Sequence, residues 1–199
     1  VQPSPTTEHS VPRPVLLDPF CGTGTVLQEA LLLGYDVCGS DLSPKMVSYT
    51  SENLAWLQRR SAEATPGTMH SVTQADATTH QWPLAQQLSA IVCETYLGQP
   101  FSAPPAPAKL STVRTTCNHI ISHFLTNLHP QLRPGTPLVI AVPAWRGSDG
   151  QFTHLPLISQ LEHLGYRRRL LQHVRPTDLC YYRENQVVAR ELLVMEVMK

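Results

Sequence analysis

The sequence predicts an α/β protein of the Rossmann-like type, with a mostly parallel seven-stranded sheet. Short apolar runs alternate with helical patterns through most of the chain, which is typical of strand–helix–strand units. The first apolar run ends in Asp18 and a glycine-rich turn, and the next ends in Asp41, about 20 residues beyond the glycines. The last apolar run, 187–198, predicts an antiparallel hairpin at the end of the sheet.

Length and composition favour one domain, expected at 15–199 after a Pro- and Ser-rich lead-in at 1–14. The formal net charge of +0 lacks the basic excess of a free-standing nucleic-acid-binding protein. Five cysteines without paired spacing favour a reduced, cytoplasmic location, and we expect no membrane span. Because the chain begins at Val1 and not at Met, we expect further N-terminal material.

The first strand (15–17), the glycine-rich turn and a helix at 26–33 form the first unit. Gly22 and Gly24 let the backbone turn sharply and approach a ligand closely, because they carry no Cβ atom. A nicotinamide dinucleotide is the weaker alternative, because Leu27 replaces the third glycine that dinucleotide sites use near the pyrophosphate.

The string from Asp18 to Thr25, DPFCGTGT, resembles motif I of S-adenosylmethionine (SAM)-dependent methyltransferases that act on exocyclic amines of nucleic-acid bases. The resemblance implies SAM as the cofactor and a class I methyltransferase fold. It also implies that Asp18 lies near the sulfonium and α-amine of SAM, directly or through water. Cys21, Gly22 and Gly24 of the same loop are also expected to be cofactor-binding residues, although the Cys21 thiol itself is expected to pack and not to react.

The second strand, 35–41, ends in Asp41, with Leu42 beside it. A carboxylate at this position can accept hydrogen bonds from both ribose hydroxyls of a nucleoside. The alternative is a helix cap, but Ser43 is the more natural N-cap of the helix expected at 45–60.

A polar loop (61–68) leads to a third strand at 69–73 and then to Asp76 and Ala77. This pattern resembles the methyltransferase position that contacts adenine. The resemblance implies that Asp76 accepts a hydrogen bond from the adenine N6 amine, and that the neighbouring backbone N–H donates to a ring nitrogen. A capping Asp in a loop is the alternative.

A fourth strand, 88–93, follows a helical turn at 84–88 and ends in Glu94-Thr95-Tyr96-Leu97-Gly98. The carboxyl ends of the first and fourth strands flank the switch point of a doubly wound sheet, so chemistry is expected in this loop.

The remaining elements complete the alternation. We expect a helix at 108–128, a strand at 136–143, a helix at 155–164 closed by Gly165, a strand-like run at 166–174 and the last strand at 187–198.

Other candidate residues have less specific surroundings. His119 and His123 are four apart, but no third ligand stands at a telling spacing, so we predict no metal site. Arg167–Arg169 and Arg175 could contact phosphate or form a solvated basic run, and Trp145 could touch substrate or pack in a loop.

Three strings, 18–25, 39–46 and 182–192, together resemble the tRNA guanosine-N2 methyltransferases, including the archaeal guanosine-10 group. The resemblance implies methyl transfer to guanine N2, with tRNA as the RNA substrate. Members of that group also carry an N-terminal RNA-binding region with a THUMP domain, and no part of this sequence matches it. We therefore expect RNA binding to need an N-terminal domain or a partner.

The fourth-strand motif departs from the group, which has Asp-Pro-Pro-Tyr where this chain has Glu94-Thr95-Tyr96-Leu97. By resemblance, Glu94 accepts hydrogen bonds from the target amine and Tyr96 stacks on the base. Two alternatives follow from the departure. One is a methyltransferase for another amine in rRNA, DNA or protein, and the other is a SAM-binding subunit without catalysis.

Overall fold

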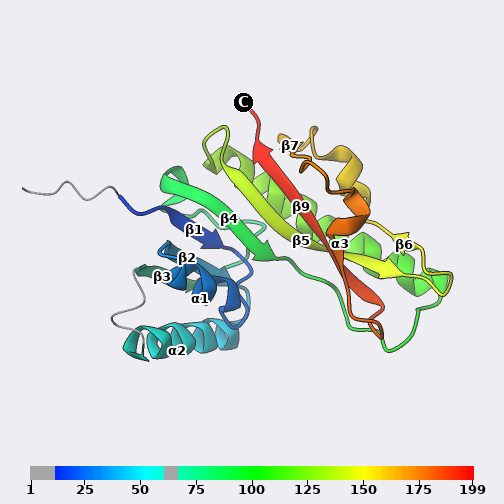
Figure 1. Ribbon diagram of the computed structural model, residues 1–199, viewed down its shortest axis with the longest axis horizontal. Helices are drawn as coiled ribbons and strands as arrows, with labels where there is room; N and C mark the ends of the chain where they lie inside the picture. Colours follow the sequence, from blue (N-terminus) through cyan, green and yellow to red (C-terminus); the bar gives the residue numbers. More distant parts are fainter. Residues whose placement is uncertain (1–11, 61–66) are drawn as a thin grey trace, which may run out of the picture.

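The computed structural model describes residues 12–60 and 67–199 (Figure 1). Most of the expected lead-in (1–14) and of the polar loop (61–68) therefore lies outside the described residues. Within the described residues, no helix combines the length and the apolar composition that a bilayer crossing needs.

A twisted sheet runs through the molecule in the order β3-β2-β1-β4-β5-β9-β7. Strands β3 to β5 are parallel, whereas β9 is antiparallel to β5 and β7. The strands on this path are β1 Val15–Asp18, β2 Asp36–Asp41, β3 Met69–Gln74, β4 Leu88–Glu94, β5 Pro137–Arg146, β7 Tyr166–Arg168 and β9 Val188–Val197. The predicted fold class is confirmed, including the antiparallel end of the sheet.

Two short strands that the sequence did not predict pair with strands of this path. Strand β6, Phe152–Thr153, pairs with β5, and strand β8, Cys180–Tyr181, pairs with β9. Each has only 2 residues, which is too short for an alternating hydrophobic pattern to appear in the sequence.

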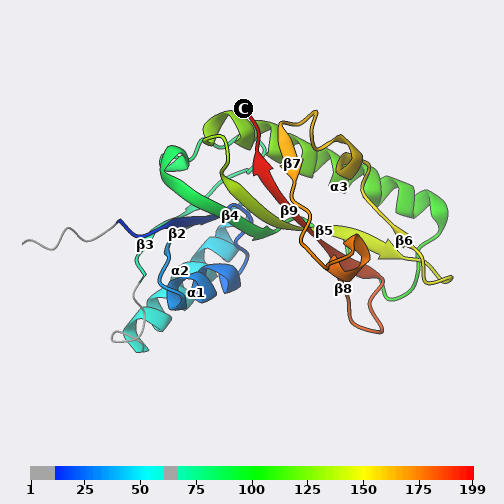
Figure 2. The same cartoon turned by 45° about the horizontal axis from the view of Figure 1, so that its top comes forward.

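Helices cover both faces of the sheet. Helices α1 (Thr25–Leu32) and α2 (Pro44–Arg60) lie on one face and α3 (Pro107–Leu128) on the other, as Figures 1 and 2 show. Four short 3-10 helices complete the described elements: η1 Ala85–Gln87, η2 His129–Gln131, η3 Pro156–Gln160 and η4 Pro176–Leu179.

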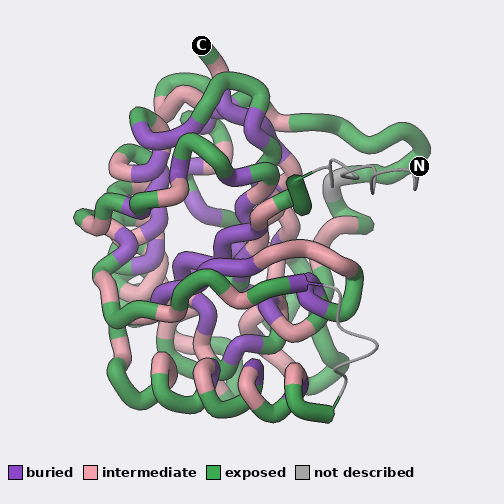
Figure 3. Tube along the Cα trace, turned by 90° about the vertical axis from the view of Figure 1, so that its left-hand side faces the viewer, coloured by how far each residue is buried: buried purple, intermediate pink, exposed green. Residues whose placement is uncertain are grey.

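Each face of the sheet has its own core. Leu27 and Leu31 of α1 pack with Leu54 of α2 on one face. Phe124 of α3 belongs to a larger core with residues of β4, β5 and β9 on the other. Figure 3 shows these buried segments in the interior, with exposed residues on the outer turns. Burial of such side chains stabilises each packed layer by about 1.5–3 kcal/mol per large residue.

The strand order creates a switch point between β1 and β4. The connection through α1 leaves β1 toward β2, whereas the connection through α3 leaves β4 toward β5, on the opposite face. These connections diverge at the carboxyl ends of the two strands, and a crevice opens there.

The predicted helix at 155–164 is wrong: the structure has only the 3-10 helix η3 and turns in this segment. Side chains of α3 bind its backbone instead, because Asn118 Oδ1 accepts from Leu157 N at 2.8 Å and Arg114 donates to His154 O.

Two strand boundaries also differ from the prediction. The strand-like run 166–174 shortens to β7, and Leu170 beyond it is 77 % exposed. Strand β5 continues past Pro143 to Arg146, because β9 pairs with it as far as Trp145 and Val188.

Candidate active site

A cavity of about 680 Å³ lies at the carboxyl ends of the parallel strands. It brings together residues that follow four different strands: Pro19, Phe20, Asp41, Leu42, Ala75, Asp76, Ala77, Thr78, Glu94, Thr95, Tyr96 and Leu97. Six of the predicted site residues are therefore neighbours around one space: Asp41, Leu42, Asp76, Ala77, Glu94 and Tyr96.

Helix α3 supplies the remaining wall of this cavity through Thr116, His119, Ile120 and His123. These residues share one face because they are three or four positions apart. The rings of His119 and His123 lie 3.9 Å apart between centroids. The sequence predicted the helix, but it did not indicate that this face borders the crevice.

The glycine-rich turn lies behind the cavity wall and shapes it. Gly22 (φ 53°) and Gly24 (φ 86°) both adopt left-handed backbone conformations that favour glycine. A Cβ atom on Gly24 would lie 2.9 Å from Thr50 Cγ2, so this position also allows close packing of the turn against α2. Neither glycine lines the cavity itself.

Asp41 links the turn to the start of α2. Its Oδ2 accepts from Gly22 N and its Oδ1 accepts from Ser43 N, both at 2.9 Å. An ionised carboxylate offers about four acceptor positions, so two remain for a ligand in the cavity. The side chain therefore both organises the loop and faces the site.

Asp18 is buried at the end of β1, 2 % exposed, and does not line the cavity. Burial raises the pKa of its carboxyl to about 8, and the charges of Asp41 and Glu94 act in the same direction. A backbone hydrogen bond from Phe20 N to Oδ1 opposes this shift. A positive charge bound nearby would lower this pKa.

Cys21 is also buried, and its sulfur accepts a hydrogen bond from Thr50 Oγ1 at 3.6 Å. Burial raises the pKa of its thiol to about 12, so the reactive thiolate is scarce at neutral pH. These surroundings agree with a packing thiol.

Asp76 stands in the turn after β3 with its side chain largely in solvent. Its Oδ1 accepts from both Thr78 N (2.9 Å) and Thr78 Oγ1 (2.7 Å), and these two bonds lower the pKa of the carboxyl. Thr78 thus holds the carboxylate ionised and fixes its orientation beside Ala77.

The loop after β4 carries the acid and the aromatic ring predicted to act on substrate. Tyr96 is 44 % exposed at the cavity wall. Thr95, between Glu94 and Tyr96, is buried. Its backbone N–H and its hydroxyl both donate to Ala141 O, at 3.0 and 2.9 Å respectively. These bonds tie the loop to β5.

Glu94 forms an ion pair that the sequence did not predict. Arg190 of β9 reaches over β5, and its Nε donates to Glu94 Oε2 at 2.5 Å. Arg190 also lines a smaller cavity of about 250 Å³, which shares Leu97 with the larger one and is bordered by 97–101 and 185–188. Arg190 belongs to the 182–192 string, but its contact with Glu94 depends on strand register.

The other basic residues singled out in the sequence have acidic partners. Arg167 and Arg169 both donate to Glu196 and lower the pKa of its carboxyl. Arg175 bonds Asp178. These contacts do not favour a phosphate site at this run.

Trp145 and its neighbour Arg146, at the end of β5, have different surroundings. Trp145 is 1 % exposed inside β5, so its ring packs in the core. Arg146 lies over the ring of Tyr182, 5.0 Å from its centroid.

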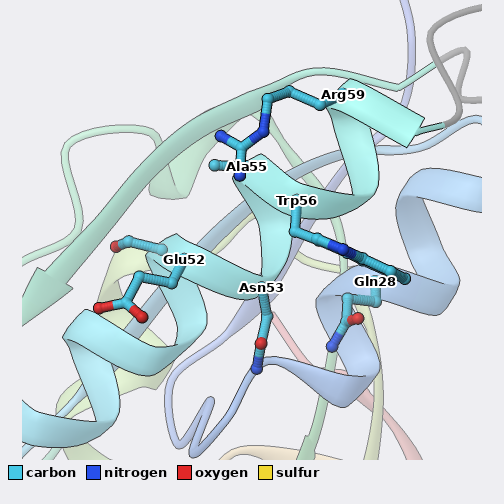
Figure 4. A pocket seen from close by; sticks show the side chains of 7 residues that line it. Gln28, Glu52, Asn53, Ala55, Trp56 and Arg59 are labelled. Atoms are coloured by element: carbon cyan, nitrogen blue, oxygen red, sulfur yellow. The ribbon is translucent and has the colours of Figure 1, made fainter.

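A further cavity, about 770 Å³ in volume, lies outside the crevice along α2 and α1, where Figure 4 shows Trp56 beside Gln28. Asn53 in its wall donates to Thr23 O at 2.9 Å and so holds α2 against the glycine-rich turn. None of the predicted cofactor or substrate residues lines this cavity.

The strand order, the glycine-rich turn and the acids at the carboxyl ends of β2, β3 and β4 belong to the class I SAM-dependent methyltransferase fold. The chain belongs to the UPF0020 family, described as RMKL-like, methyltransferase domain, whose model matches residues 10–145.

One curated relative is a tRNA (guanine(10)-N2)-dimethyltransferase from Methanothermobacter thermautotrophicus. It is 32 % identical over 128 residues, which are 64 % of this chain and 32 % of the relative. The aligned region thus spans about a third of that protein.

Solved structures agree on the fold. An rRNA methylase from Streptococcus thermophilus superposes with a TM-score of 0.54 at 15 % identity, over 94 % of this chain and 89 % of the other. A magnesium protoporphyrin IX methyltransferase from Synechocystis was solved with bound S-adenosylhomocysteine (SAH). It superposes with a TM-score of 0.57 at 15 % identity, over 94 % of this chain and 74 % of the other.

Proposed function

We propose that this chain transfers a methyl group from SAM to the exocyclic N2 amine of guanine in tRNA. The observation that carries the proposal is the shared cavity, in which Asp41 and Asp76 lie on the same space as Glu94 and Tyr96. Such a space can hold a nucleoside cofactor and the target amine together.

The residues around the cavity fit SAM. Asp41 keeps acceptor positions for the ribose hydroxyls, and Asp76 keeps Oδ2 for the adenine amine. When bound, SAM supplies an electrophilic methyl group on a positively charged sulfur.

Glu94 and Tyr96 act on the amine. Glu94 accepts a hydrogen bond from the N2 amine and orients the nitrogen lone pair toward the methyl group. Tyr96 stacks on the guanine ring and fixes its plane. With SAM bound, the nitrogen would accept the methyl group, SAH would be the leaving group, and the amine proton would pass to Glu94 or to water. Positioning supplies most of the rate enhancement in such a displacement.

The choice of guanine N2 and of tRNA rests on the curated relative, which is named for that reaction. The aligned region spans 32 % of the relative, so tRNA binding by the whole protein draws on an N-terminal domain or a partner. We also expect the protein to act in the cytoplasm.

The test uses radiolabelled SAM and unmodified bulk tRNA, followed by nucleoside chromatography of the digest. Label in N2-methylguanosine supports the proposal. Glu94→Ala should abolish the label while SAM affinity, measured by calorimetry, changes little. Retained turnover in Glu94→Ala would refute the role of this carboxylate.

A second candidate function is SAM binding without catalysis, as a subunit of a larger assembly. The Glu94–Arg190 ion pair favours it, because a carboxylate that already bonds a guanidinium is a poorer acceptor for an amine. This candidate predicts SAM binding with no label in any nucleoside, whereas label in a different nucleoside or in protein would identify another amine as substrate.

A further inference from the structure

Three metal-ligating side chains converge on strands β6, β8 and β9, apart from the crevice. His154 follows β6, Cys180 lies in β8 and Glu191 lies in β9. One ligand atom from each lies within 4.8 Å of the other two. His154 Nδ1 is 2.6 Å from Glu191 Oε2, and Cys180 is the direct register partner of Glu191.

The three groups form a compact triangle and not a catalytic relay. In a Cys–His–acid relay, the imidazole ring separates the thiol from the carboxylate. Here the sulfur and the carboxylate oxygen are themselves within 4.8 Å. Ligand atoms about 2.0–2.3 Å from a tetrahedral zinc ion stand roughly 3.3–3.8 Å apart, so small movements, in which His154 and Glu191 separate slightly from their 2.6 Å contact, would place all three atoms around one ion.

We propose that His154, Cys180 and Glu191 bind a divalent transition-metal ion of the zinc type. Imidazole nitrogen, thiolate sulfur and carboxylate oxygen together suit zinc, whereas magnesium and calcium prefer oxygen ligands alone. Three protein ligands leave a fourth tetrahedral position for water. The proposal does not depend on the proposed methyl transfer.

Burial and charge around the triangle are compatible with this ion. The side chain of Glu191 is 5 % exposed and that of His154 is 47 % exposed, so the ion can reach an otherwise buried carboxylate. Arg168 Nη2 lies 3.9 Å from Glu191 Oε1, the oxygen that does not bond His154. The Glu191 carboxylate can therefore bind the ion through Oε2 while Oε1 faces the Arg168 guanidinium.

Metal binding must displace protons from this site. Burial raises the pKa of the Cys180 thiol to about 11, and Glu191 adds to the shift. The ion takes the thiolate, and the thiol proton goes to water. His154 binds through Nδ1 and carries its proton on Nε2.

The ion would join two strands of 2 residues each to the long strand β9. The segment after β8 leads to residues 185–188, which border the smaller cavity beside Arg190. An ion bound by all three side chains would hold this segment against β9.

The experiment is cobalt titration of the full chain after removal of metal by a chelator. Co²⁺ bound to a thiolate gives a charge-transfer absorption in the near ultraviolet, and Zn²⁺ should displace it at one equivalent. Cys180→Ser should lose this absorption, and His154→Ala should weaken Co²⁺ binding by roughly tenfold or more. Cys117→Ala, in the core, and His163→Ala, exposed and outside the triangle, are the matched controls.

A second readout covers variants that fold poorly. Zn²⁺ should raise the melting temperature of the unmodified chain and leave that of His154→Ala unchanged, since only the native state holds the complete site. His154 is half-exposed, so its removal should leave the fold intact. Absence of the charge-transfer absorption in the unmodified chain would overturn the proposal, as would equal absorption in Cys180→Ser.

Discussion

Arg190 and Glu94 lie 96 residues apart in the chain and form an ion pair at the rim of the crevice, with Nε 2.5 Å from Oε2. The side chains are 30 % and 48 % exposed, so solvent screens the attraction and limits its contribution to stability. Its value is geometric, because the guanidinium fixes where the longer Glu side chain places its carboxylate.

Replacing Arg190 should therefore affect turnover more than binding. We expect Arg190→Met to lower kcat for methyl transfer by about 100-fold, the size of effect that a misplacement of about 1 Å produces. The KM for SAM should change little. The kcat of Arg190→Lys should lie between those of the unmodified enzyme and of Arg190→Met, because an ammonium group keeps the charge but lacks the planar guanidinium geometry.

The control is Arg133→Met, at an exposed residue of the turn before β5. A faster Arg190→Met enzyme would contradict the positioning role and would identify the arginine as an inhibitor of Glu94.

The buried carboxyl of Asp18 should make the protein less stable as pH rises. Its pKa is about 8 in the folded protein against an ordinary value of 3.8. Between these values the folded state binds more protons than the unfolded state, so the free energy of unfolding falls with increasing pH. The slope from one such group is at most about 1.4 kcal/mol per pH unit.

Urea unfolding of the unmodified chain and of Asp18→Asn at pH 5.5 and 7.5 measures this contribution. The Asn side chain keeps an oxygen for Phe20 N but cannot titrate, so its stability should fall less over this range. Parallel pH dependences in the two proteins would show that Asp18 does not carry the effect.

SAM binding should release protons at pH 7 if its positive charges lie beside this group. A nearby cation lowers the pKa of a carboxyl, so Asp18 would ionise as the complex forms. Calorimetry in two buffers with different ionisation enthalpies measures the number of protons. SAM binding to Asp18→Asn should release fewer protons than SAM binding to the unmodified chain. Binding of SAH, which lacks the sulfonium charge, should also release fewer protons than binding of SAM.

Gly24→Ala should destabilise the fold more than a change that introduces only backbone strain. A left-handed conformation costs about 1–2 kcal/mol for a residue with a Cβ atom. At Gly24 that atom would also press on Thr50, whose hydroxyl bonds Gly22 O at 2.7 Å and resists a shift. Gly135→Ala is the matched control, because its φ is 84° and no atom lies within 4 Å.

Chemical denaturation of both variants gives the difference in the free energy of unfolding. Thr50→Ser removes the contacting methyl group and should reduce the cost of Gly24→Ala. Equal losses of unfolding free energy in Gly24→Ala and Gly135→Ala would refute the contribution of the contact with Thr50.

The sequence predicted the parts of the site that depend on strand ends. Asp41 ends β2 and Asp76 follows β3, and parallel strands bring their carboxyl ends to one edge. The pairing of Glu94 with Arg190 could not be predicted, because it requires the register of β9 against β5. A different register, that of β8 against β9, pairs Cys180 with Glu191, and His154 comes from a third segment.

The helical pattern at 155–164 misled for a related reason. Leu157 and Leu161 are buried as a helical face would bury them. The hydrogen bonds that Asn118 and Arg114 make with this segment are tertiary, and no local pattern reports them.

Arg190 and Glu191 are neighbours on β9, so their side chains leave opposite faces of the sheet. One meets an acid at the crevice, and the other meets His154 and Arg168. A slip of this strand by one residue in one direction would place Glu191 against Glu94, and a slip in the other direction would place Arg190 against Arg168. Either slip would bring like charges together, so this adjacent pair of opposite charges favours the observed alignment of the sheet.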